Sequence, residues 1–229
     1  RLVIRLDSLS RRDHLEVPHS FRHQVDSALH SLDALQETSR EMMNYSLLTK
    51  LFTRVQPQDE AFLLNELLKH QVLLQDYTLY RAVVLRADGA SFQSEATDLM
   101  LFKLKKAGRL LQWAVPSGVH CVLVQNDPNL VSGLLSVRGD AQPLLDQSLQ
   151  IIQQNFEAWK RECDLSFTMG ISYPMDNLQN LRGAYLQALS CTDQRLILGL
   201  GKLILPSMCA SQLSISGSQI KSAIEDIMQ

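Results

Sequence analysis

Three segments decide the fold: Leu-Ser-Phe-Thr-Met-Gly-Ile-Ser at residues 165–172, Asn-Leu-Arg-Gly-Ala-Tyr-Leu-Gln-Ala-Leu-Ser at residues 180–190, and Leu-Gly-Leu-Gly-Lys-Leu-Ile-Leu at residues 198–205. Apolar residues alternate along the first segment, which predicts a strand. They recur at helical spacing in the second segment, which predicts a helix. The third segment is a short apolar run between Gly201 and Pro206, which favours another strand.

The pattern upstream of these segments extends them into a larger sheet. The expected elements are strand 79–85, helix 97–106, strand 109–115, strand 119–125, a loop region at 128–140 and a long helix at 143–161. Gly108 is expected to end the first helix. Pro116-Ser117-Gly118 is expected to form the turn of a hairpin between the second and third strands. The order β-α-β-β-α-β-α-β predicts an α+β fold, a ferredoxin-like palm with a mixed β-sheet packed by helices and preceded by an N-terminal helical segment.

The domain organisation follows the changes in composition along the chain. The expected parts are an irregular lead-in at 1–20, a helical dimerisation and connector segment at 21–76, the palm domain at 77–210, and a linker or the start of a downstream domain at 211–229. The chain begins without Met inside an apolar and basic run, so we expect a fragment of a longer protein.

A heptad pattern marks the helical segment that precedes the palm. Spacings alternate between three and four residues over about three heptads, as in the a and d positions of a coiled coil. The positions of this dimer seam are Val25, Ala28, Leu32, Leu35, Ser39 and Met42. The pattern predicts a homodimer that passes a signal along a parallel coiled coil. An amphipathic helix packed on its own domain is the alternative, and Ser39 weakens the seam.

Composition excludes several classes of function. The net charge is −2 and no basic stripe is present, which argues against direct nucleic-acid binding. The 4 cysteines form no Cys-x-x-Cys pair, which is typical of a reducing compartment. No apolar run reaches the ~18 residues of a membrane span. We expect a cytoplasmic protein or the cytoplasmic part of a membrane-anchored one.

No constellation of residues predicts catalysis, a metal site or a cofactor. The four histidines between residues 14 and 30 are too far apart along the chain for one ion. Gly199-Leu200-Gly201 enters a strand from a helix, the reverse of a phosphate-binding loop. His120 has two interpretations, a ligand contact or an ordinary strand histidine. The sequence therefore predicts a protein that is not an enzyme.

The segments 167–172, 181–189 and 199–204 resemble the conserved motifs of GGDEF domains, the palm-type domains that include cyclic-di-GMP synthases. The similarity covers about residues 77–206. It implies that the hairpin turn carries the family signature, here Ser117, Gly118, Val119 and His120. The acidic residues of that signature are replaced by Val119 and His120, and only Asp88 remains at the end of the first strand. Because two-metal nucleotidyl transfer needs several carboxylates, the departures imply that synthase activity is lost and that the turn is at most the edge of a ligand site.

The chain resembles the degenerate GGDEF-like domain of YesN-type AraC-family transcription regulators more closely than it resembles catalytic GGDEF domains. It shares Gly170-Ile171-Ser172, the segment 184–189, and a helical run like that at 47–52. The resemblance implies an upstream membrane sensor or receiver domain, and DNA binding only through units outside this chain. It implies a bacterial signalling domain that relays a signal by rearranging a dimer. An effector- or nucleotide-binding receptor of unidentified ligand is the alternative, and a nucleotidyl cyclase has less support.

Overall fold

The computed structural model of the protein describes residues 45–52, 57–89 and 94–213, together with the single positions 27, 31, 42 and 43. The chain divides into two units, residues 1–43 and residues 44–229. The fold described below belongs to the second unit.

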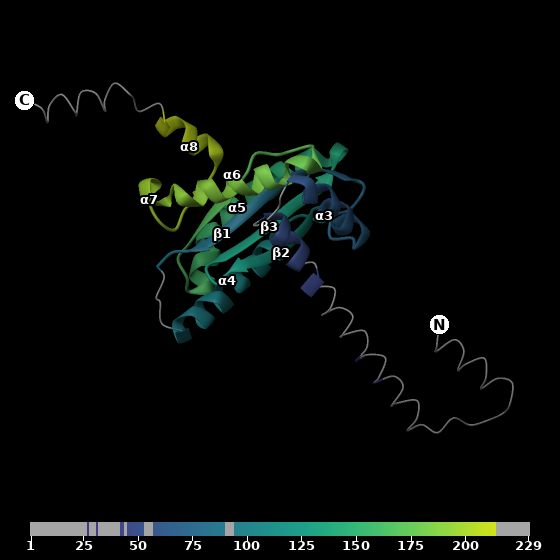
Figure 1. The fold of residues 1–229 in the computed structure, drawn as a ribbon. Helices are drawn as coiled ribbons and strands as arrows, with labels where there is room; N and C mark the ends of the chain where they lie inside the picture. The colour runs from purple at the N-terminus through teal and green to yellow at the C-terminus, as the bar shows by residue number, and fades with distance from the viewer. Residues whose placement is uncertain are drawn as a thin grey trace, which may run out of the picture. The chain divides into compact units, whose positions relative to one another are not determined.

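A five-stranded sheet with the order β2-β3-β1-β4-β5 lies at the centre of this unit (Figure 1). Its strands are β1 (Tyr77–Ala87), β2 (His120–Asp127), β3 (Leu130–Arg138), β4 (Phe167–Ile171) and β5 (Leu203–Ile204). The central strand β1 pairs antiparallel with β3 and β4, β2 pairs antiparallel with β3, and β4 pairs parallel with β5. This is the strand order of a ferredoxin-like palm with one strand added, so the predicted α+β fold is confirmed.

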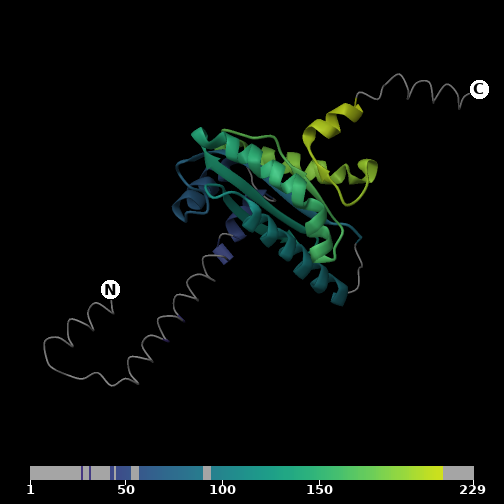
Figure 2. The same cartoon turned by 180° about the vertical axis from the view of Figure 1, so that it is seen from behind.

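Helices cover both faces of the sheet (Figures 1 and 2). They are α3 (Pro57–Lys69), α4 (Ser94–Ala114), α5 (Gln142–Cys163), α6 (Leu181–Asp193), α7 (Arg195–Leu198) and α8 (Pro206–Leu213), with short 3-10 turns η1 (Gly139–Ala141) and η2 (Leu178–Asn180). Helices α4 and α5 pack on one face. Residues 45–52, α3 and α6 pack on the other face, so the helices before the sheet share a core with it.

The strand β1 takes part in both cores. Val83 and Leu85 are buried against α4 and α5, whereas Ala82 and Val84 are buried with α3 and α6. A strand that is apolar on both sides can only be stable between two layers. The near-continuous apolar run that predicted a central strand is therefore confirmed.

The helix after β1 is longer than predicted. The prediction of a strand at 109–115 is wrong, because α4 continues to Ala114. The buried residues Met100, Leu104, Ala107 and Leu111 keep helical spacing to the end of α4. Gly108 does not end the helix. A Cβ at this position would lie 3.0 Å from Leu123 Cδ1, so the glycine lets α4 approach β2 closely.

The hairpin lies one element later than predicted, because residues 130–138 form β3 rather than a loop. Ser132, Gly133 and Ser136 interrupt the apolar pattern of this segment, although all three lie inside the sheet. A Cβ on Gly133 would lie 2.3 Å from the carbonyl oxygen of Val122. The glycine that resembles a loop signal is thus required by close packing within the strand pair.

The remaining elements of the palm match their predictions. The segments at 165–205 form β4, α6 and β5, and the long helix predicted at 143–161 is α5. Pro143 lies in the first turn of α5, and Asp164 ends the helix in the left-handed conformation with φ of 47°. Both features are ordinary helix boundaries.

Candidate functional site

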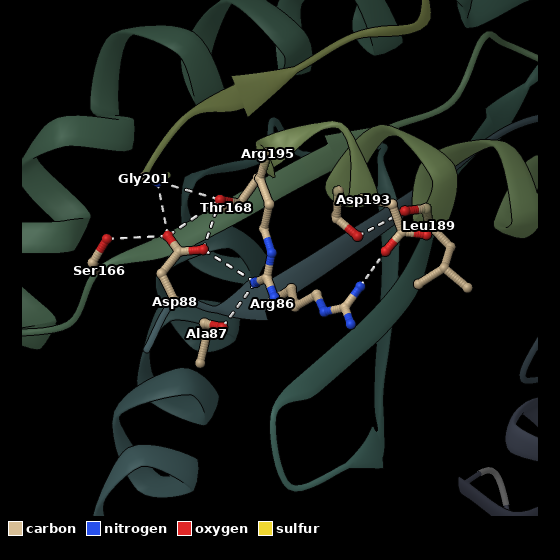
Figure 3. Close-up of polar contacts among 10 residues, drawn as sticks. Arg86, Ala87, Asp88, Ser166, Thr168, Leu189, Asp193, Arg195 and Gly201 are labelled. Atoms are coloured by element: carbon tan, nitrogen blue, oxygen red, sulfur yellow. Dashed lines mark hydrogen bonds and ion pairs between the residues drawn. The ribbon is translucent and has the colours of Figure 1, made fainter. Parts of the chain in front are cut away.

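The carboxylate of Asp88 lies where the central strand ends (Figure 3). Asp88 directly follows β1 and precedes Gly89, whose φ of 84° turns the chain away from the sheet. The amide of Asp88 donates to the carbonyl oxygen of Ser166, at 2.9 Å, which aligns β1 with the start of β4. The side chain is only 2% exposed. A buried carboxylate requires protein partners, because water cannot solvate it.

Four protein groups donate hydrogen bonds to this carboxylate. Gly201 N lies 2.8 Å and Ser166 Oγ 3.1 Å from Oδ2. Thr168 Oγ1 lies 2.9 Å from Oδ1. Arg195 Nη1 lies 3.2 Å from Oδ1 and also donates to the carbonyl oxygen of residue 87 at 3.0 Å. The donors come from β4, α7 and the residues before β5, so one side chain ties these elements to β1.

A second ion pair lies beside this cluster but closer to solvent. Arg86 pairs with Asp193 at the end of α6, and the Asp193 side chain is 59% exposed. Thr192 donates to the carbonyl oxygen of Leu189 at 2.7 Å within the same helix. Figure 3 shows the two arginines side by side, each facing its own carboxylate. The exposed pair is screened by water and adds little stability.

The geometry determines what Asp88 can do chemically. An ionised carboxylate has about four lone-pair positions, and protein donors occupy both oxygens here. A divalent metal would have to displace these donors, and a general base would need a free lone pair facing a substrate. The arrangement is therefore that of a structural joint.

The residues predicted to form the signature turn do not form a hairpin turn. Ser117 and Gly118 are exposed in the connection between α4 and β2, where Gly118 has φ of 100°. Val119 donates its amide to Pro116 at 3.1 Å, and its side chain packs at the margin of the α4–α5 core. The hairpin prediction fails because residues 109–114 belong to a helix.

His120 begins β2 and has a protein partner. Its Nε2 lies 3.1 Å from the carbonyl oxygen of Val72, in the connection between α3 and β1. Its ring also meets that of Tyr77 edge to face, with centroids 6.2 Å apart. These contacts fit an ordinary strand histidine, and a ligand role for the four residues 117–120 stays a prediction.

The observed hairpin turn lies between Asp127 and Leu130, which end β2 and begin β3. Asp127 Oδ1 accepts a hydrogen bond from the amide of Asn129 at 3.0 Å. The turn is thus closed by its own aspartate, as is common in tight turns.

The predicted dimer seam falls almost entirely on residues that the structure does not describe. Val25, Ala28, Leu32 and Leu35 lie outside the described residues. Met42 is helical and 64% exposed. The coiled-coil dimer therefore stays a prediction.

A cleft of about 510 Å³ lies between α3 and η2. Leu64, Leu68 and Leu178 supply its apolar lining, and Glu60 and Asn65 are among its polar residues. Glu60 Oε1 is buried and has no hydrogen-bond partner in the part of the chain that the structure describes. The volume is within the usual range for small-molecule sites. Sequence reasoning missed this cleft, because η2 and α3 are distant in the chain.

Two further features bear on the site. Within residues 45–52, 57–89 and 94–213, no three ligand-type side chains gather as a metal site would require. None of the described helices combines the length and apolar character needed to cross a membrane.

From the sequence, Asp88 was named only as the one carboxylate left at the end of the first strand, no site was assigned to it, and its partners were not predicted. Ser166, which lies just before β4, and Thr168 within β4 occupy alternate positions, so their side chains lie on the same side, and this period-two pattern was the available signal. Arg195 and Gly201 carried no such signal.

Comparison with known proteins gives no relative from which a function could be transferred. No protein-family model matches the sequence, and no curated protein is significantly similar to it.

Proposed function

We propose that this chain is a non-catalytic regulatory domain of a bacterial AraC-type transcription regulator, located in the cytoplasm. The observation that carries the proposal is the Asp88 carboxylate, which protein donors occupy on both oxygens. The Asp88 carboxylate is the side chain at the end of β1 best suited to catalysis. Its hydrogen bonds instead join β1 to β4, to α7 and to the residues before β5. Such a joint suits a domain that transmits movement toward its C-terminal elements.

The relay in this proposal acts through a homodimer. The heptad pattern at Val25, Ala28, Leu32, Leu35 and Met42 supports a parallel coiled coil that changes packing when an upstream sensor or receiver domain is activated. The DNA-binding units lie outside this chain in the proposal, which is consistent with its net charge of −2. A shift between two dimer packings changes the spacing of those units.

A reporter assay tests this role. The chain is fused to a monomeric DNA-binding domain that represses a promoter only as a dimer. The wild-type chain should give repression, and Leu32→Glu, which places a charge in the seam, should abolish it. Asp26→Asn changes a charge outside the seam and is the matched control. Repression that survives Leu32→Glu, or a wild-type chain that sediments as a monomer, would contradict the proposal.

A turnover assay tests the non-catalytic part. The folded chain is incubated with GTP and Mg²⁺, and no nucleotide product is expected. Product formation would favour the nucleotidyl cyclase, which has less support because it needs several metal-binding carboxylates.

An effector-binding receptor is a second candidate, favoured by the cleft between α3 and η2. Glu60 Oε1, which has no hydrogen-bond partner among the described residues, lies beside three leucines and suits a ligand with an amino or guanidinium group on an apolar body. Calorimetry with phenethylamine, agmatine, GTP, cyclic di-GMP and sugar acids should give heat with an amine, and Glu60→Gln should remove it. Glu66→Gln removes the same charge from a residue that pairs with Lys69 on the same helix, and should leave binding unchanged. If no ligand gives heat, the receptor function is contradicted and the domain acts only as a relay.

A further inference from the structure

Two cysteine thiols face each other where α8 packs on α6. Cys191 on α6 and Cys209 on α8 have their Sγ atoms 3.9 Å apart, and both thiols are free. The sulfurs of a disulfide are about 2.05 Å apart. A closing movement of about 2 Å, which side-chain rotation and a slight shift of the short helix can share, would therefore bring the two sulfurs to bonding distance.

The two thiols differ in their access to solvent. Cys191 is 2% exposed, whereas Cys209 is half-buried. The Cys209 thiol also donates to the carbonyl oxygen of Leu205, at 3.6 Å, within its own helix. Burial, and secondly the neighbouring Cys209, raises the pKa of Cys191 to about 12. Cys191 is therefore a protonated, shielded thiol near neutral pH, and an oxidant from solution meets Cys209 first.

We propose that Cys191 and Cys209 form an oxidisable dithiol, a modification site at which a peroxide produces a disulfide between α6 and α8. The Cys209 thiol loses its proton, and the thiolate sulfur attacks the O–O bond of hydrogen peroxide to form Cys209 sulfenic acid and hydroxide. The hydroxide takes up the proton that Cys209 released and leaves as water. The Cys191 sulfur then bonds to the Cys209 sulfur and displaces hydroxide, which takes up the Cys191 proton and leaves as water. The two thiols lose two electrons and two protons in total, and one peroxide becomes two water molecules.

The disulfide would fasten the last described helix to the body of the palm. Cys191 belongs to α6, whose residues Ala184, Tyr185 and Ala188 are buried in the core. Oxidation thus fixes α8 to a rigid element, and reduction releases it. The effect on signalling rests on the proposed relay function, because α8 lies on the C-terminal side of the joint at Asp88. Formation of the bond does not depend on that function.

Peptide mapping tests the site directly. The reduced chain is treated with hydrogen peroxide, its remaining thiols are alkylated, and it is digested with trypsin without reduction. Cleavage at Arg and Lys places Cys191 in peptide 183–195 and Cys209 in peptide 203–221. We expect these two peptides to be joined in the wild type and to separate when dithiothreitol is added. Cys209→Ser should lose the cross-link, and Cys163→Ser, which changes a buried cysteine of the other core, should keep it.

Hydrogen exchange tests the consequence. Oxidation should slow exchange of the α8 amides by at least about tenfold in the wild type, because the cross-link opposes local opening. The same treatment should leave α8 of Cys209→Ser unchanged, and circular dichroism confirms that this variant is folded. The site is overturned if Cys209 is alkylated or oxidised to sulfinic acid without a cross-link. Fastening of α8 is overturned if the cross-link forms while exchange stays fast. Neither outcome bears on the reporter assay of the relay function. The disulfide proposal and the relay proposal can therefore fail independently of each other.

Discussion

Two residues of opposite charge, Arg86 and Asp88, mark the end of the central strand, and their surroundings give them unequal importance. Arg86 pairs with a carboxylate that is 59% exposed, whereas Asp88 is 2% exposed and pairs with Arg195. Charges attract more strongly where water is excluded, but a buried charge that loses its partner is costly. Stability at this end of the sheet should therefore depend on Asp88 far more than on Arg86.

We expect Asp88→Asn to lower the free energy of unfolding by about 3 kcal/mol, because it leaves Arg195 without its counterion and turns an amide toward the Gly201 N–H. Asp193→Asn removes the exposed pair and should cost at most about 1 kcal/mol. Urea unfolding followed by circular dichroism measures both. An Asp88→Asn variant as stable as the wild type would mean that the carboxylate is no joint, and would reopen the question of catalysis.

Alkaline pH should destabilise the fold through Tyr80. Burial raises the pKa of Tyr80 from 10.0 to about 12, and its hydroxyl donates to the carbonyl oxygen of Tyr77. The folded state therefore holds the phenolic proton more tightly than the unfolded state. The resulting stability is fully present below about pH 10 and is lost as pH rises toward about 12.

Urea midpoints measured from about pH 8 to about pH 11 should fall less steeply for Tyr80→Phe than for the wild type. Tyr173→Phe, at a residue that is 48% exposed, should keep the wild-type slope. Equal slopes for all three proteins would show that Tyr80 titrates alike in both states.

Among the elements, β4 packs closely on the backbone of α6, and Gly170 permits this approach. A Cβ at Gly170 would lie 2.1 Å from the carbonyl oxygen of Ala188. That atom belongs to the helix backbone and cannot rotate away. The packing distance between β4 and α6 is thus set by a residue without a side chain.

Gly170→Ala should destabilise the protein by about 2 kcal/mol or more, because strand and helix must separate. Gly183→Ala lies on α6 with nothing within 4 Å of the added Cβ, and should stabilise the helix by about 0.5–1 kcal/mol. Thermal unfolding of the two variants gives opposite shifts if the contact is as described. A small or positive shift for Gly170→Ala would contradict it.

Sequence patterns predicted those elements whose apolar residues follow one clear period. The alternation in β4, the helical spacing in α6 and the apolar run in β1 each matched the structure. The errors arose at Gly108 and Gly133, which resemble breaks in a helix or strand but serve close contacts with β2. Only the partner element explains such a glycine, and a single sequence does not reveal that partner.

Less of the candidate site than of the fold could be predicted from the sequence. Asp88 was named only as the one carboxylate left after a buried strand, and no site was assigned to it. Its donors Thr168 and Gly201 lie far along the chain and meet it only after β4 and β5 join the sheet. The cleft beside Glu60 depends on packing between α3 and η2, for which no local pattern exists.

The whole unit is organised as two cores, one on each face of the sheet. Residues of β1 contribute to both the α3–α6 side and the α4–α5 side. Phe52, from the helix before α3, stacks on Tyr185 of α6 with ring centroids 4.5 Å apart. Because neither core is complete without β1, we expect both to unfold in one transition.

Leu67→Ala in one core and Leu111→Ala in the other test this cooperativity, since both side chains are 0% exposed. Each should cost about 2–5 kcal/mol, and each should shift the same single transition. Far-ultraviolet circular dichroism and tryptophan fluorescence should coincide in both variants. Two separated transitions in either variant would show that the cores are independent.

The central position of β1 also constrains how the chain folds during synthesis. Val83 pairs with Gly133 on one side and with Ile171 on the other, so β1 leaves the ribosome long before either neighbour exists. Both pairings are distant in sequence, which slows their formation. The central strand thus waits unpaired while β3, α5 and β4 are being translated, and during this interval the nascent chain is exposed to aggregation and benefits from a chaperone.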